Sequence, residues 1–507
     1  MDFQLREINC QKANTGDSFP QGVQDFSWSV GGASLWLPKK SYFKATMRIT
    51  VAGNPGNQAL VEDEVAFADN VIGNLFDNIY FRGGGQDISS IVSYAPQASI
   101  LRQRLTKSGA WLNSMGKDVF ALDSNFNSRV NKVTVNTDLE EEVKRINLGA
   151  SDHRLDYTLA FSTLGVITGV NTNFSGNGVS DVTVNGGAGQ PAVPLLRVGD
   201  YIDVQQADGG IVRVKVTAVG SATAATYAPA LTSDVGATAG LFAYRGQGKK
   251  TTYTALWKPP IGIFDSDKAL GSGDFRISLN PNARYKTAAI ESVANLVPAP
   301  ASVDFEILEL KLYIALIQDT VQQSGVESLF FSEQHIQSKP MTGLANSLDF
   351  TVPPSTKMIA FFLQSNKAGS DTRIPPSKFR ALGNYELGVK SFQLTYANRS
   401  RPSTKWESGF DTTRNTMQQR FWDTYQECGL AELQGGTETM QEWMDRGPIY
   451  VYRFDRDSND KSTLVQLQLE VDRYEPNCNV MLCAFYTRTV EIAYQNGMIT
   501  DVKSLNV

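Results

Sequence analysis

Alternation of apolar and polar residues is the strongest pattern in this chain. In LELKLYIAL, one face of an extended strand would carry Leu308, Leu310, Leu312, Ile314 and Leu316. A period of two is typical of a strand that covers a core with one face. Further strand candidates are 42–51, 76–81, 156–162, 357–364, 392–396, 465–471 and 480–494. The chain is therefore predicted to be all-β.

Two segments with helical periodicity interrupt the strands. The first, 96–107, has a proline at its start, where the missing N–H has no helical partner to lose. The second, 412–428, follows the cap candidate Asp411 and ends before Gly429. Each of these helices follows a strand candidate, so a strand–helix–strand order occurs twice.

A change in composition marks residues 166–247. This segment contains no Glu, Cys, His or Trp, and Lys215 is its only lysine. The stretch 200–219 predicts a hairpin whose turn contains two glycines, since glycine accepts positive φ. We expect 166–247 to be an inserted small β-barrel or sandwich, preceded by a charged helix at 137–146.

The length of 507 residues also requires more than one core, because single cores stop growing at about 250–300 residues. With the insert set aside, the repeated order predicts two similar domains. The expected division is an N-terminal arm at 1–19, a first sandwich at 20–317, a linker at 318–328, a second sandwich at 329–495 and a C-terminal tail at 496–507.

This tandem plan resembles the double jelly-roll major capsid proteins of tailless icosahedral DNA viruses, in particular those of polinton-like viruses and virophages. The apolar, proline-containing stretch 257–264, the loop 270–273 and the strand 275–279 look like one segment of that family's first roll. The strands 305–317 and 480–494 resemble the last strands of the two rolls. The fold expected from the resemblance is two jelly-roll β-sandwiches in tandem, with a few short helices and the insert in the first.

The resemblance also implies a function. A protein of this family is a non-enzymatic subunit. Three copies form a homotrimer, which is the pseudo-hexameric capsomer, and these capsomers tile an icosahedral shell. Expected partners are neighbouring capsomers, a penton and minor capsid proteins, with possible host-surface contact through 166–247. The expected location is the virion, after synthesis in the host cell interior. A carbohydrate-binding or adhesin-like β protein and a β-sandwich glycoside hydrolase stay open as alternatives.

Charge and hydropathy add little to this interpretation. The net charge of -5 gives no strong nucleic-acid signal, and the long basic arm that would bind a genome is absent from the N-terminal residues. No stretch approaches the roughly 20 apolar residues of a transmembrane helix, and the start has no signal-peptide pattern. We therefore expect a chain that is not secreted.

Catalytic chemistry has few candidates. His153 and His335 are the only histidines, which leaves little for a catalytic triad or a histidine metal site, and both are expected at the surface. The cysteines have no metal-binding spacing and are expected to be buried thiols: Cys10, Cys428, Cys478 and Cys483. We predict no catalytic, cofactor-binding or metal-binding residue, and no cofactor.

Four weaker motifs have simpler interpretations. The segment 245–252 departs from a phosphate-binding loop and is predicted to be a basic connector that leaves the insert. The segment 455–466 lacks the glycine and glutamate of a calcium loop and is predicted to be a hairpin turn. Three glycines at 83–85 are interpreted as a turn. The basic segment 398–406 offers Arg399, Arg401 and Lys405 for contact with nucleic acid, but we favour an exposed interdomain or intersubunit loop.

The proline pair Pro259–Pro260 raises a separate question. Proline ends a strand and fixes φ, so this pair would present a rigid apolar segment. The segment is either presented at the rim of a roll or to a neighbouring subunit, or it packs as a connector on its own domain.

Overall fold

The computed structural model describes these residues of the chain: 3–11, 19, 22–31, 33–52, 65–123, 144–146, 159–162, 164–169, 201–206, 211–221, 224–238, 243–245, 248–292, 303–318, 324–379, 389–396, 399–408, 410–411, 414–431, 435–436, 438–454 and 463–505.

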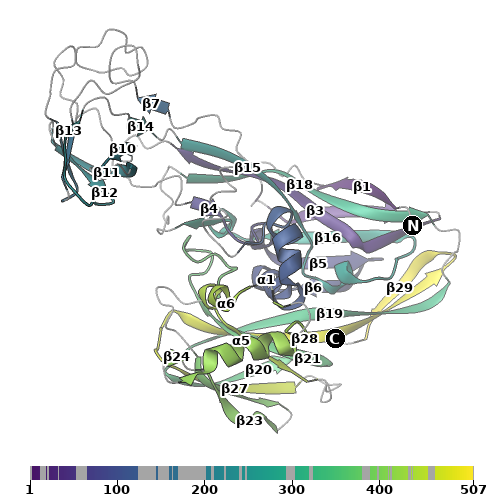
Figure 1. Ribbon diagram of the computed structural model, residues 1–507. Coiled ribbons are helices and arrows are strands. Elements are labelled where there is room, and N and C mark those ends of the chain that lie inside the picture. The colour runs from purple at the N-terminus through teal and green to yellow at the C-terminus, as the bar shows by residue number, and fades with distance from the viewer. Residues whose placement is uncertain are drawn as a thin grey trace.

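Two antiparallel sheets form the first sandwich (Figure 1). One sheet has the order β1 (Gln4–Asn9), β18 (Val303–Gln318), β3 (Ser34–Ala52), β15 (Gly248–Trp257). The other has the order β2 (Gln24–Val30), β16 (Gly273–Pro281), β5 (Phe76–Gly83), β6 (Gln86–Ile91).

The second sandwich has the same construction. One sheet has the order β19 (Gly325–Pro340), β28 (Cys478–Gln495), β21 (Thr356–Ser365), β26 (Ile449–Arg453), and β29 (Met498–Ser504) also pairs with β28. The other has the order β20 (Ala345–Val352), β27 (Thr463–Val471), β22 (Val389–Tyr396), β23 (Arg399–Glu407).

The two sandwiches share one topology. When the eight strands of each are numbered in chain order, with β29 and the two-stranded pairs set aside, both sandwiches have sheets ordered 1-8-3-6 and 2-7-4-5. Eight strands in two sheets with these crossovers make a jelly roll. The helices α1 (Ala95–Thr106) and α5 (Thr416–Glu427) both lie in the connection between strands 5 and 6. The predicted duplication of the strand–helix–strand order is therefore present in the topology.

Shorter elements fill the connections. They are β4 (Val65–Phe67), η3 (Gly73–Leu75), α2 (Gly109–Trp111), η4 (Leu112–Gly116), η6 (Gly262–Asp265), α4 (Tyr285–Ala288), β17 (Ile290–Ser292), β24 (Phe410–Asp411), β25 (Arg414–Asn415) and α6 (Met440–Arg446). β4 pairs with β17, and β24 pairs with β25.

Both ends of the chain differ from the expected arm and tail. β1 is strand 1 of the first roll and pairs with β18, although it falls within the predicted arm 1–19. β29 falls within the predicted tail 496–507. The period-two pattern missed β1 because its only buried residue is Ile8, so its two faces do not differ in polarity. The predicted linker is also shorter, since β18 ends at Gln318 and β19 begins at Gly325.

Two helix predictions need correction. α5 begins at Thr416, because the cap candidate Asp411 pairs with Arg414 in the small hairpin of β24 and β25. The predicted helix 137–146 is wrong at its end, where Lys144–Ile146 forms the strand β7; the rest of it lies outside the described residues.

The insert forms a sheet of its own, at the far end of β15 from the rolls (Figure 1). Its order is β13 (Val235–Thr238), β8 (Leu159–Ser162), β9 (Val166–Gly169), β12 (Ala224–Ala228), β11 (Ile211–Ser221), β10 (Tyr201–Gln205), β14 (Ala243–Arg245), β7 (Lys144–Ile146). β10 and β11 pair as the predicted hairpin. The sheet starts earlier than the predicted 166, because β7 and β8 also belong to it, β7 at one edge and β8 between β13 and β9.

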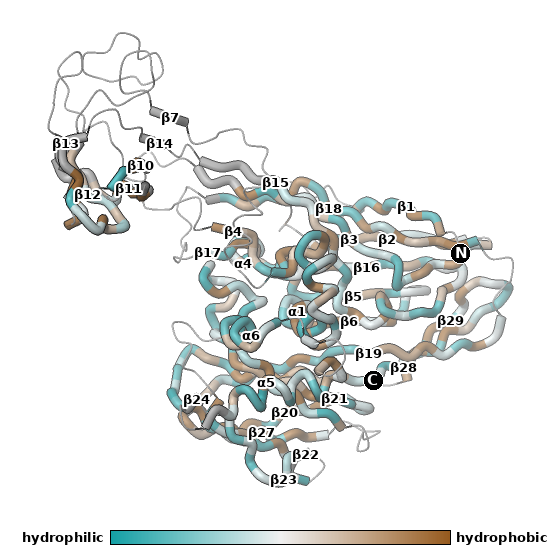
Figure 2. The backbone as a smooth tube through the Cα atoms, viewed as in Figure 1, coloured by the Kyte–Doolittle hydropathy of each residue, from teal (hydrophilic) through white to brown (hydrophobic). Residues whose placement is uncertain are grey.

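The apolar core of the first roll extends onto one face of a sheet of the second roll, which also has a core of its own. Alternate residues of β21 face opposite ways: Ala360 and Phe362 pack with the first roll's core, whereas Ile359 and Phe361 pack inside the second roll. β28 follows the same rule, so this sheet is buried on both faces. Figure 2 shows hydrophobic and hydrophilic residues alternating along many of the other strands, as expected where one face meets solvent.

The insert carries buried apolar side chains that belong to neither of these cores. They include Ile202, Val204, Val214 and Val216, each 0% exposed. A segment with its own core needs no strand from the rolls.

We predict that the rolls fold without the insert. Replacing 125–246 by a Gly/Ser linker of about ten residues should change the free energy of unfolding by about 1 kcal/mol or less, because closure entropy depends weakly on loop length. Val119 already lies beside β15, where its O accepts a hydrogen bond from Leu256 N at 2.7 Å. Urea unfolding followed by tryptophan fluorescence measures the change. A product that no longer unfolds cooperatively would show that the segment belongs to the roll.

Candidate functional site at the junction of the two jelly rolls

The helix α1 lies at the junction of the rolls and contacts both (Figure 1). It begins after Tyr94, whose φ is 62°, and carries Pro96 in its first turn. Nine of its residues are buried, polar ones included. Ser99 donates to Asn70 Oδ1 of the first roll at 2.9 Å, and Gln97 donates to Gln364 Oε1 of the second at 3.0 Å. A polar helix can be buried here because its side chains find partners on both sides.

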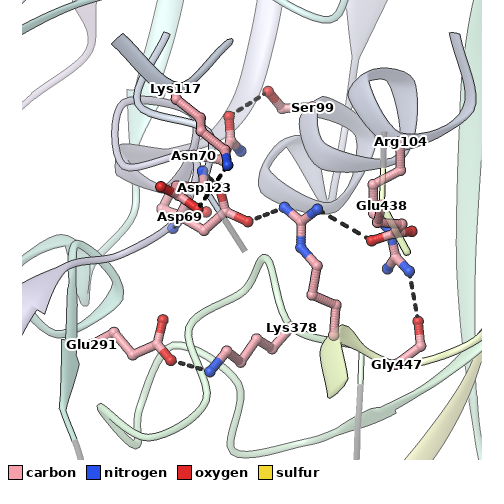
Figure 3. Close-up of polar contacts among 12 residues, drawn as sticks. Asp69, Asn70, Ser99, Arg104, Lys117, Asp123, Glu291, Lys378, Glu438 and Gly447 are labelled. Carbon is pink, nitrogen blue, oxygen red and sulfur yellow. Dashed lines mark hydrogen bonds and ion pairs between the residues drawn. The ribbon is translucent and has the colours of Figure 1, made fainter. Parts of the chain in front are cut away.

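Four buried charges cross the junction (Figure 3). Arg104 of α1 donates from Nε to Glu438 Oε1 at 2.7 Å. Arg446 at the end of α6 donates to Glu438 Oε2 at 3.2 Å and to Asp69 of the first roll. All four side chains are at most 4% exposed. The two cations and two anions make the network neutral overall. This pairing offsets the desolvation cost of burying the four charges.

The pKa of Arg446 reflects this environment. Burial lowers the pKa of the guanidinium, but the charges of Asp69 and Glu438 outweigh burial and raise it above the ordinary value. Arg446 therefore stays charged at neutral pH.

Backbone contacts position the network. Thr439 and Glu442 form a capping box that starts α6 directly after Glu438. At the other end, Gly447 O accepts from Arg104 Nη2 at 2.9 Å. Gly447 has φ of 100°, and a Cβ there would lie 1.4 Å from Phe379 O, so only glycine fits.

A second set of contacts ties the rolls together nearby. Lys378 of the second roll forms an ion pair with Glu291 of β17. Next to it, Ser292 Oγ lies 2.6 Å from Thr372 Oγ1, and Ser292 N donates to Thr372 O at 3.0 Å. These bonds fix the relative position of the rolls at a second point.

Glu333 of β19 is a buried carboxyl at the same junction. It is 0% exposed and accepts a hydrogen bond from Ser89 Oγ of β6. It also accepts one from the backbone N of Gly262 in η6, at 3.3 Å. Burial raises its pKa to about 7, although the Ser89 hydrogen bond and the charges of Arg102 and Arg488 act in the opposite direction. Its proton therefore comes off near neutral pH, inside the roll–roll contact.

The arrangement joins two domains and shows no catalytic constellation among the residues described. That part of the chain also holds no group of His, Cys, Asp and Glu suited to a metal ion. In the described ranges no helix is long and apolar enough to cross a membrane.

The histidines and cysteines lie largely where the sequence placed them. His335 is exposed on β19, as expected, and His153 lies outside the described residues. Cys478 and Cys483 are buried thiols, whereas Cys10 and Cys428 are only partly buried by exposed area. Burial raises the pKa of Cys478 to about 12, so this thiol is not a nucleophile at neutral pH.

The weaker motifs resolve into strands and a turn. Gly84 and Gly85 have positive φ and form the turn between β5 and β6, as predicted. The segment 398–406 was wrongly predicted as a loop, since 399–407 is the strand β23 beside β22. Residues 248–252 belong to β15, and the 455–462 segment lies outside the described residues.

The proline-containing stretch is a connector inside the chain. Pro259 and Pro260 are buried, and Phe264 packs against Trp36 with ring centroids 5.9 Å apart. A Cβ on Gly262 would lie 2.5 Å from the Phe331 side chain of the second roll. Of the two alternatives, the packed connector is the one that the structure contains, and it packs against the second roll as well as its own.

Sequence reasoning missed the junction residues. Arg104 and Glu438 are 334 residues apart, and Asp69 and Arg446 are 377 apart, so no local pattern links them. The one available signal was the Thr439–Glu442 capping box, which predicts the start of α6.

These observations define the class of the fold. Two jelly rolls of identical strand order, joined through a shared core and carrying an inserted β domain, make the chain a double jelly-roll protein.

One solved structure shares this fold, and two others match it with lower scores. A chain in the cryo-EM structure of the Sputnik virophage matches with a TM-score of 0.52 at 12% identity, over 100% of this chain and 88% of that one. The mavirus major capsid protein matches with a TM-score of 0.45 at 11% identity, over 99% and 90%. The Faustovirus major capsid protein matches with 0.48 at 7% identity, over 96% and 90%. No protein-family model and no curated protein sequence matches the chain.

We predict that the stability of the protein depends on the charge of Glu438 in this network. Glu438→Gln leaves two buried cations facing one anion and should lower the free energy of unfolding by about 3–5 kcal/mol. The matched control is Glu470→Gln, because Glu470 pairs with Lys405 at 3.2 Å on the surface, where such a pair contributes about 1 kcal/mol or less. Equal effects of the two changes in urea unfolding would contradict the assigned role.

We also predict a pH dependence from Glu333. Its folded pKa of about 7 exceeds the ordinary 4.5, so the native state holds the proton more tightly than the unfolded chain does. Stability should therefore fall as pH rises from about 4.5 to 7, by roughly 1.4 kcal/mol per unit. Glu333→Gln should remove this part of the pH dependence. The free energy of unfolding of the variant, relative to that of the wild type, should therefore increase from pH 5 to pH 8.

The control for this measurement is Glu327→Gln, on the same strand, whose carboxylate pairs with Lys268 at 3.0 Å and is 30% exposed. If Glu333→Gln and Glu327→Gln give parallel stability–pH curves, Glu333 is not the titrating group.

Proposed function

We propose that this protein is a major capsid protein, a structural subunit of an icosahedral virus shell. The observation that carries the proposal is the duplicated strand order, 1-8-3-6 and 2-7-4-5 in both rolls. Three copies around a threefold axis would present six similar sandwiches, a pseudo-hexameric capsomer that fits a hexagonal lattice. The fold likeness to a chain of the Sputnik virophage supports this function over the carbohydrate-binding and glycoside hydrolase alternatives.

The partners follow from this role. Neighbouring capsomers, a penton and minor capsid proteins would complete the shell, and the protein would reside in the virion after synthesis in the host cell. The insert projects from the connection between strands 5 and 6 of the first roll, away from the shared core. In that position it would contact trimer neighbours or a host surface.

A shell subunit must keep its two rolls in one orientation, since the lattice repeats their relative angle many times. The buried network of Asp69, Arg446, Glu438 and Arg104 supplies this constraint within each chain. No chemistry at the junction is needed for such a role.

The trimer gives the direct test. Light scattering after size-exclusion chromatography should give three times the chain mass of 55.6 kDa at micromolar concentration. Negative-stain images should show a particle with pseudo-sixfold outline, which distinguishes the capsomer from an unrelated trimer. A monomer, or a trimer with only threefold features, would contradict the proposal.

A further inference from the structure

A cleft of about 620 Å³ opens between the two rolls, apart from the buried ion network. Its walls come from α1 and η6 of the first roll and from β19 and β28 of the second. The volume lies within the range of about 300–1,000 Å³ typical of ligand sites, and clefts between domains are a common place for them.

A break in the strand pattern puts a polar side chain into this cleft. Phe331 and Ile336 of β19 both pack with the first roll, although they are five positions apart, so the period-two alternation shifts between them. The shift buries the neighbours Glu333 and Gln334 together. Gln334 lines the cleft, is 5% exposed, and its Oε1 has no hydrogen-bond partner among the described residues. An unpaired buried acceptor costs about 1–3 kcal/mol, so a bound N–H donor would stabilise it.

Aromatic side chains supply an apolar surface in the same cleft. Phe331 and Phe485 are 6% and 7% exposed. Phe330 at the rim is 66% exposed, so its ring is accessible to a ligand in the cleft.

The cations around the cleft differ in how they are neutralised. Arg102 pairs with Asp265, and Lys39 pairs with Asp267 at 2.5 Å. The Lys107 ammonium lies 5.3 Å from the centre of the Trp111 ring and forms no ion pair within the described part of the chain. The cleft therefore retains one cation available to an anionic group.

We propose that this cleft binds an extended acidic peptide segment of a partner protein, with an aromatic or aliphatic side chain beside the acidic one. A main-chain N–H of the peptide donates to Gln334 Oε1, its carboxylate pairs with Lys107, and its apolar side chain packs on Phe330. An ionised fatty acid would satisfy the cation and the aromatic surface, but it has no donor for Gln334. The peptide is the chemistry that satisfies all three.

Fluorescence anisotropy on the full-length chain tests the assignment. The probe is a fluorescein-labelled hexapeptide in which aspartates alternate with phenylalanine and leucine, compared with the same peptide carrying asparagines. The acidic peptide should bind at least tenfold more tightly than the neutral one. Lys107→Glu and Gln334→Leu should each weaken its binding about tenfold, and Phe330→Ala should weaken it severalfold.

Two controls separate the site from general effects. Lys339→Glu makes the same charge change at an exposed position of β19 that does not line the cleft, and Trp422→Ala removes an exposed aromatic from α5. Both should bind the peptide as the wild type does. Unchanged melting temperatures show that the cleft variants are folded.

The proposal is overturned if the acidic peptide does not bind, if the acidic and neutral peptides bind equally, or if Lys107→Glu behaves like Lys339→Glu. Binding of laurate without binding of the peptide would also overturn it, in favour of an amphiphile site. Because all the residues that line the cleft belong to one chain, these outcomes are independent of whether the protein forms a trimer.

Discussion

The double-sided burial of one sheet is the constraint on which the rest of this structure depends. The sheet of β19, β28, β21 and β26 packs inside its own roll with one face and against the first roll with the other. Fully burying a side chain such as Phe362 or Met481 contributes about 1.5–3 kcal/mol. Four such residues, counting Phe331 and Phe485, therefore give roughly 6–12 kcal/mol at the junction. Two rolls joined in this way behave as one body.

Apolar contact alone would not fix how the rolls face each other, because the hydrophobic effect has no direction. The direction comes from the polar groups at the junction. Arg104 and Arg446 each need an anion from a particular place, and Gly447 lets the chain pass close to Phe379 O. A rotated arrangement would leave buried charges without partners, at a cost of several kcal/mol.

The sequence predicted the elements that carry a local pattern. β18 and β27 carry clear alternation, β21 and β28 are recognisable as apolar runs of strand length, and α1 and the end of α5 have recognisable boundaries at Pro96 and Gly429. β1 was missed because its exposed residues include Leu5 as well as Arg6, which removes the contrast between faces. The junction could not be predicted, since Asp69 and Arg446 meet only when both rolls have folded and docked.

Hydrogen exchange followed by mass spectrometry across the thermal transition tests most directly whether the two rolls form one cooperative unit. The peptides to compare come from β16 in the first roll and β27 in the second, two strands that do not contact each other's sheets. A single unit predicts that both peptides lose protection at the same temperature. Loss of protection in one roll while the other stays protected would contradict this account.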